Sequence, residues 1–164
     1  MKRKALLLTM LALACLLGGC YEQIQYPAEG ALLDYTSAPY GVADAFTTVI
    51  TINADGSGTI RAQLDEGQTA DISQIAPVPF TVIPEYLDLL KQAVYEIRFL
   101  QVGPELSNDS GDAAAYHYIT LHTLGGDYRA GGLDPDDVGF ETLRLAILEC
   151  VPEEARAAFQ AQTE

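Results

Sequence analysis

The sequence predicts an α+β domain in which an antiparallel sheet of about four strands carries two main helices on one face, in the order ββαββα. Two pairs of β-rich runs are each joined by a glycine-containing turn, which is typical of hairpins. Two further stretches repeat apolar residues at helical spacing, and each follows one of the hairpins. We expect both helices to cover the same face and to leave the other face of the sheet open to a partner or ligand.

The first hairpin is expected over residues 46–53 and 59–64. Both runs are rich in β-branched residues, and Asp55-Gly56 between them is a strong turn signal because glycine adopts positive φ at little cost. The turn faintly resembles a calcium-binding loop, but Leu64 stands where the loop's glutamate would be needed, which excludes that reading. Residues 65–80 are acidic and then rich in proline, and we expect a loop or an irregular edge there.

The first helix is expected to begin at Pro84, whose missing N–H costs nothing at the first helical position. Leu87, Leu90, Val94 and Ile97 recur at helical spacing and form its predicted buried stripe.

The second hairpin is expected over residues 115–124 and 128–130, with its turn at Gly125-Gly126-Asp127. Successive side chains of a strand point to opposite faces. One face therefore carries Tyr116, Tyr118, Thr120 and His122, whereas the other carries His117, Ile119 and Leu121.

The last main helix is expected to start at Asp134 as its cap, with Pro135 in the first turn. Its inner stripe comprises Phe140, Leu143, Ile147 and Cys150, after which an alanine-rich amphipathic tail runs to about Gln162. Cys150 is interpreted as a small buried hydrophobe, because Glu149 and Glu153 would disfavour a reactive thiolate.

The N-terminus has the three parts of an export signal. Lys2, Arg3 and Lys4 precede an apolar run over residues 5–17, which is too short to cross a bilayer that needs about 20 residues. The run ends in Leu17-Gly18-Gly19-Cys20, which resembles the lipobox of bacterial lipoproteins. That resemblance implies cleavage between Gly19 and Cys20 and lipid on the Cys20 thiol. Cys15 is a rival lipidation site, and an ordinary signal peptide that leaves Cys20 in a disulfide is a second alternative.

The predicted organisation is a lipoprotein signal peptide over residues 1–19, a lipidated cysteine with a tether over 20–45, and a single domain over 46–164. Removal of the signal leaves about 145 residues with a net charge near −17, since three of the nine cations are lost and all 23 acids remain. Such a surface repels nucleic acid, which is excluded as a partner. It would also repel anionic lipids. We therefore expect the lipid on Cys20 to anchor the protein, with the domain on the outer face of a bacterial membrane.

No catalytic set or cofactor motif is readable. His117 and His122 point to opposite faces and cannot share a metal by themselves, so neither a metal site nor a cofactor is predicted. Residues 46–151 resemble small uncharacterised bacterial lipoproteins with a hairpin–helix–hairpin–helix plan, a resemblance that implies no activity. The leading hypothesis is therefore a binding or accessory module for an envelope protein or small ligand, with Tyr116, Tyr118 and His122 as a binding patch. The alternatives are a hydrolase that uses His117 or His122 with a carboxylate such as Asp127, and a structural role in the envelope.

Overall fold

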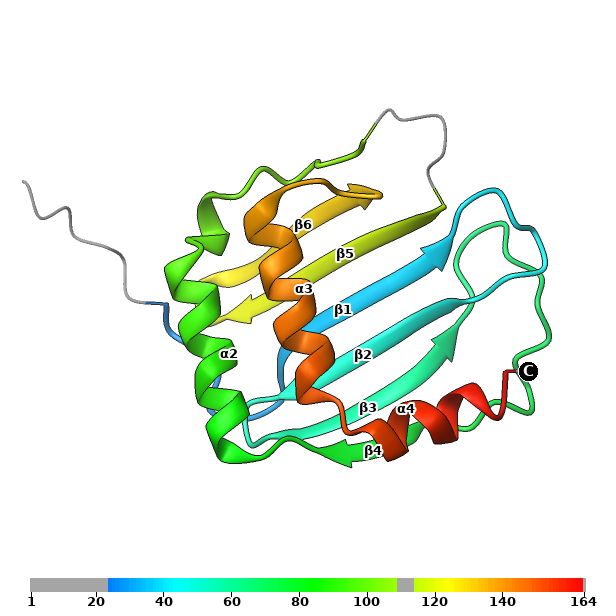
Figure 1. Ribbon diagram of the computed structural model, residues 1–164, viewed down its shortest axis with the longest axis horizontal. Coiled ribbons are helices and arrows are strands. Elements are labelled where there is room, and N and C mark those ends of the chain that lie inside the picture. The colour runs from blue at the N-terminus through cyan, green and yellow to red at the C-terminus, as the bar shows by residue number, and fades with distance from the viewer. Residues whose placement is uncertain (1–23, 109–113, 164) are drawn as a thin grey trace, which may run out of the picture.

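A computed structural model of the chain describes residues 24–108 and 114–163, so the predicted signal peptide, the Gly19–Cys20 cleavage site and the lipidation of Cys20 lie outside it. The described residues form an α+β fold of two layers, with a sheet on one side and helices on the other (Figure 1). All strand pairs are antiparallel. The strands are β1 (Ala31–Pro39), β2 (Thr47–Asn53), β3 (Ser57–Gln63), β4 (Val78–Thr81), β5 (Ala115–Thr123) and β6 (Gly126–Leu133).

The sheet is larger than the sequence predicts. It has six strands in the order β4-β3-β2-β1-β5-β6, whereas two hairpins would supply about four. Both predicted hairpins, β2–β3 and β5–β6, form. The second turn is shorter than predicted, because Gly126 and Asp127 already pair with β5 and β6 continues to Leu133. The additional strands are β4, from the segment expected to be irregular, and β1, from the segment expected to be a tether. Because β1 lies between β2 and β5, it joins the two hairpins into one sheet.

The helical layer also contains one element more than the two main helices predicted. It comprises α2 (Pro84–Glu96), α3 (Val138–Cys150) and α4 (Glu153–Gln160), with a short 3₁₀ turn η1 (Phe99–Gln101) after α2. Helix α2 begins at Pro84 as expected, whereas α3 begins four residues after Asp134. Asp137 is the cap, since its carboxylate accepts a hydrogen bond from the Phe140 N–H at 2.8 Å. Asp134 has a φ of 40° and instead accepts a hydrogen bond from the backbone of Ala114.

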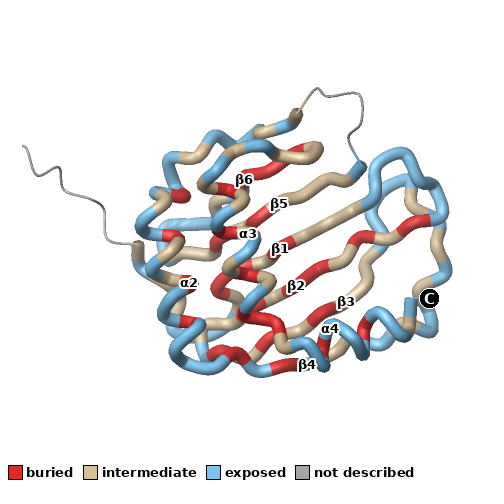
Figure 2. The backbone as a smooth tube through the Cα atoms, viewed as in Figure 1, coloured by how far each residue is buried: buried red, intermediate tan, exposed pale blue. Residues whose placement is uncertain are grey.

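The core lies between the two layers, where the buried parts of the helices meet the buried parts of the central strands (Figure 2). The predicted stripe of α3 is buried in full, and that of α2 is buried at Leu87, Leu90 and Val94. Cys150 belongs to this core. Burial, with a smaller contribution from the Glu149 carboxylate, raises the pKa of its thiol to about 11, so the group is unreactive near neutral pH.

None of the helices in the described part of the chain covers the other face of the sheet (Figure 1). Directly paired residues of antiparallel strands share a face, so the strand register assigns each side chain to one of the two sides. Ile119 pairs with Tyr35 and with Ala130, and these buried residues face the helices. Their neighbours along each strand form the open face and are mostly threonine, tyrosine and charged residues. None of the described helices has the length and apolar character needed to cross a membrane.

Candidate functional site

The open face carries a continuous row of aromatic contacts. Tyr116 and Tyr118 project from β5 and stack with their ring centroids 6.4 Å apart and an interplanar angle of 11°. Tyr40, just beyond β1, meets Tyr116 edge to face at 5.6 Å. At the other end, the guanidinium carbon of Arg129 on β6 lies 3.9 Å from the centre of the Tyr118 ring. We call these four residues the aromatic row.

The aromatic row borders a hollow of about 320 Å³ in the open face. Thr36 and Ala38 of β1 and Thr47 of β2 also line this hollow, and Asp65 lines it from the loop that follows β3. The Thr47 hydroxyl donates a hydrogen bond to the Asp65 carboxylate and lies 3.3 Å from the side-chain oxygen of Gln68, and these contacts hold the loop beside the sheet. The hollow thus combines aromatic rings with hydroxyl, carboxylate and guanidinium groups, a mixture typical of ligand sites.

Two features suit the row for contact with a ligand. Tyr116 and Tyr118 are only partly buried, and Tyr40 has 51% of its surface exposed. Partial burial and the nearby Glu105 carboxylate raise the pKa of the Tyr118 phenol, so its hydroxyl remains a hydrogen-bond donor at neutral pH. The stacked guanidinium places a positive charge beside the hollow on an otherwise strongly acidic chain.

The structure brings together only part of the patch predicted from the sequence. Tyr116 and Tyr118 line the hollow, whereas His122 shares their face but lies four residues beyond Tyr118 along β5. Arg129 is not among the site residues predicted from the sequence. In the observed hairpin register it pairs with Thr120 and so lies diagonally next to Tyr118. The predicted turn over residues 125–127 would instead have placed Arg129 opposite Thr123, on the other face of the sheet.

His122 forms a separate cluster that links three strands of the open face. Its Nε2 atom lies 3.0 Å from an Asp34 oxygen on β1, and its Nδ1 atom lies 2.8 Å from an Asp127 oxygen on β6. Partial burial opposes charge on the ring, but hydrogen bonds to Asp127 and Asp34 outweigh it and raise the pKa of His122. Since both ring nitrogens meet carboxylates, neither is available as a general base in this arrangement.

Replacement of His122 by glutamine is expected to lower stability in a pH-dependent way. Because folding raises the pKa of His122, its contribution is fully present below the unfolded pKa near 6.5 and is lost as the pH rises through the folded value. We expect a deficit of about 1 kcal/mol at pH 5.5, discounted for partial exposure, that shrinks toward pH 8.5. Urea unfolding of both proteins across this pH range measures it.

His117→Gln provides a control of opposite sign. Burial and the nearby Arg144 lower the pKa of His117, so its protonation in the unfolded chain destabilises the wild-type protein as the pH falls below about 6.5. The stability difference between wild type and His117→Gln should therefore grow with rising pH. If the stability difference between wild type and His122→Gln does not change with pH, a protonated His122 does not stabilise the fold through Asp34 and Asp127.

His117 lies on the helix-covered face, as the strand alternation predicts. Its Nδ1 atom is 2.7 Å from the Tyr35 hydroxyl, and the imidazole ring also stacks with the Tyr35 ring. Its Nε2 atom is 3.8 Å from the Asp134 carboxylate. Arg144, paired with Glu141, lies near this cluster and disfavours a charge on His117. The two histidines therefore occupy different faces, and the structure does not join them in one site.

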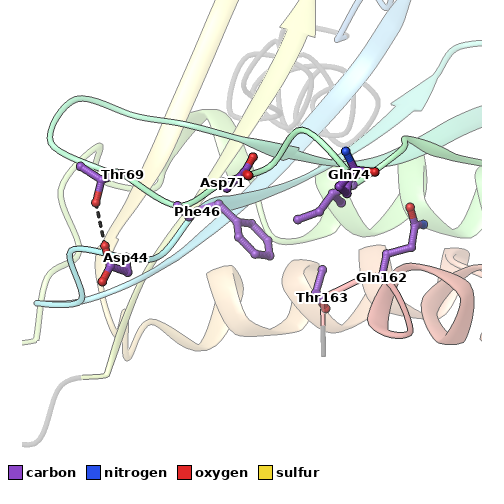
Figure 3. A pocket seen from close by; sticks show the side chains of 9 residues that line it. Asp44, Phe46, Thr69, Asp71, Gln74, Gln162 and Thr163 are labelled. Atoms are coloured by element: carbon purple, nitrogen blue, oxygen red, sulfur yellow. Dashed lines mark hydrogen bonds between the residues drawn. The ribbon is translucent and has the colours of Figure 1, made fainter.

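A second hollow, of about 400 Å³, lies where the loop after β3 meets the C-terminal end (Figure 3). Phe46 lines it and packs edge to face on Phe159 at 6.4 Å. Its polar groups serve to hold the surrounding loops: Asp44 accepts a hydrogen bond from the Thr69 hydroxyl at 2.8 Å, and Gln162 accepts one from the Ala76 N–H at 2.8 Å. We therefore regard the hollow beside the aromatic row as the better candidate for ligand binding.

Comparison of the chain with protein-family models and with curated protein sequences finds no match. Within residues 24–108 and 114–163, no group of three or more histidine, cysteine or acidic side chains is placed to hold a metal ion.

Proposed function

We propose that the chain is a lipid-anchored binding module of a bacterial cell envelope, in which the open face of the sheet takes the ligand. Two independent arguments support this proposal. The basic N-terminus, the short apolar run and Leu17-Gly18-Gly19-Cys20 support export and lipidation. The observation that carries the binding role is the aromatic row, which borders a hollow on the face that no helix covers.

The chemistry of the hollow favours a neutral carbohydrate chain as the ligand. The exposed parts of the tyrosine side chains can pack against the C–H groups of a sugar ring, while threonine, Asp65 and Arg129 offer both donors and acceptors to its hydroxyls. A mature net charge near −17 disfavours strongly anionic polymers.

Titration calorimetry with uncharged oligosaccharides tests this ligand class. Suitable probes are the tetramer of N-acetylglucosamine, maltohexaose and cellohexaose, with polygalacturonate as the anionic comparison. We expect at least one neutral probe to bind with a Kd of about 1 mM or tighter. Tyr118→Ser should weaken that binding about two- to tenfold, because an aromatic contact contributes about 0.5–1.5 kcal/mol.

The matched control is Tyr86→Ser, which removes a more exposed tyrosine from α2 on the helical side of the molecule. This variant should bind like the wild-type protein, and circular dichroism should show that both variants are folded. If none of the neutral probes binds, or if Tyr86→Ser loses as much affinity as Tyr118→Ser, the proposed role of the open face is wrong.

Mass spectrometry of the mature N-terminus tests the anchor separately. We expect the first residue to be Cys20 with a diacylglyceryl group on its sulfur. An unmodified Cys20 thiol would refute anchoring without affecting the oligosaccharide result.

A further inference from the structure

The described chain begins at one well-defined place on the domain. Ile24 packs against the hydrophobic core, and the Gln25 carbonyl accepts a hydrogen bond from the N–H of Leu124 at 2.9 Å. The Tyr26 hydroxyl donates to the Lys91 carbonyl of α2 at 3.5 Å. The first described residues are thus fixed between α2 and the β5–β6 turn, at one edge of the fold (Figure 1).

This exit point limits how far the domain can be from the lipid. Cys20 precedes Ile24 by four residues, and a fully extended chain of that length spans at most about 14 Å. The sequence predicted a tether over residues 20–45, but residues 31–39 belong to the sheet, and Ile24 and Tyr26 pack against the core. A lipid on Cys20 would therefore hold this edge of the domain close to the bilayer surface.

Exposed apolar side chains occur on the elements that hold this N-terminal segment and on η1, which follows α2. Leu124, at the β5–β6 turn, has 67% of its surface exposed, and Tyr95, one turn after Lys91 on α2, has 52% exposed. Leu100 of η1 has 37% exposed and sits beside Phe99, which packs on Tyr128 close to the same turn. We call Leu124, Tyr95 and Leu100 the anchor-side pole.

We propose that the anchor-side pole rests in the interfacial layer of the bilayer that holds the lipid on Cys20. This inference rests on the lipidation in the proposed function. Leucine and tyrosine suit this layer, because tyrosine presents an apolar ring with a polar hydroxyl to the headgroup region. Asp88 and Glu96 on α2 offset the charge of Lys91, so the contact would be apolar and would not require anionic lipid. The short connection between Cys20 and Ile24 gives the anchor-side pole a high effective concentration at the bilayer surface. A weak contact is therefore sufficient to keep the pole on the membrane.

Single tryptophans provide a direct test, because the natural chain contains none. Leu124→Trp and Tyr95→Trp place reporters at the anchor-side pole, and Val42→Trp places one at an exposed site of the loop beyond the opposite end of β1. Each full-length protein is lipidated in cells, purified and reconstituted in phosphatidylcholine vesicles with and without brominated acyl chains. We expect brominated lipid to quench the tryptophans at 124 and 95 at least twofold, and to leave that at 42 unchanged.

A second variant tests whether the native leucine contributes, since tryptophan itself favours membrane interfaces. Addition of Leu124→Ser to Tyr95→Trp should reduce the quenching at position 95 by at least half. If mass spectrometry shows lipid on Cys20 but the tryptophans at 124 and 42 are quenched equally, the docking inference is overturned and the anchor stands. An unmodified Cys20 overturns both the anchor and the docking.

Discussion

Leu33→Ala is expected to lower the free energy of unfolding by about 3 kcal/mol. Leu33 is fully buried in β1, where it pairs with Ile52 on one side and Leu121 on the other. Removal of a leucine side chain from such a site costs the transfer free energy of the lost atoms and leaves a cavity. Because the segment was expected to be a tether, in which the same substitution would cost almost nothing, this variant discriminates sharply between the two descriptions.

Val42→Ala is the matched control from the same part of the chain. Val42 has 53% of its surface exposed and lies in the loop between β1 and β2, so we expect a change within about 0.5 kcal/mol. Urea unfolding monitored by circular dichroism measures both variants. Equal stabilities of Leu33→Ala and Val42→Ala would mean that β1 is not part of the folded sheet.

Gly131→Ala should destabilise the domain by about 3 kcal/mol and also disrupt the aromatic row. Gly131 pairs with Tyr118 in the β5–β6 hairpin and has a φ of 147°. An added Cβ would lie 2.1 Å from the His117 carbonyl oxygen and 2.7 Å from the Tyr118 Cα. Relief of that overlap requires β6 to move away from β5, which combines the cost of overpacking with that of a strained φ. Separation of these strands would also move Arg129 relative to Tyr118.

Gly126→Ala isolates the contribution of the backbone conformation. Gly126 lies at the other end of β6 with a φ of 124°, but an added Cβ there would meet no atom within 4 Å. We expect it to cost about 1 kcal/mol and to leave oligosaccharide binding intact. Calorimetry measures the loss of oligosaccharide affinity, and urea unfolding measures the loss of stability. If both losses are the same for the two variants, the close approach of β6 to Tyr118 is not the reason why position 131 requires glycine.

Local patterns predicted the elements that depend on local interactions. The Asp55-Gly56 turn identified β2 and β3, and the apolar spacing after Pro84 identified α2. The alternation along β5 correctly separated Tyr116, Tyr118 and His122 from His117. In each of these cases, neighbours in the sequence determine the conformation, so the signal is contained in one short window.

The features that the sequence did not reveal depend on distant partners. Strand β1 has no turn that joins it to β5, and its Leu33 and Tyr35 are interrupted by polar residues that suit the open face. The start of α3 was misplaced because Asp134, Asp136 and Asp137 are all plausible caps, and only contact with Ala114 sets Asp134 aside. The hollow combines residues of four strands and one loop, a combination that only the sheet order defines.

Strand β5 connects the two proposed surfaces and so fixes their separation. Leu124 follows its last residue, and Tyr118 lies six residues earlier, which corresponds to about 20 Å along an extended strand. Under the proposed anchoring, the aromatic row would sit at a nearly constant height above the lipid headgroups. A lipid-anchored protein diffuses in two dimensions, so it would search a thin layer parallel to the membrane. Its ligands would be those envelope polymers that pass through that layer, whatever their abundance elsewhere.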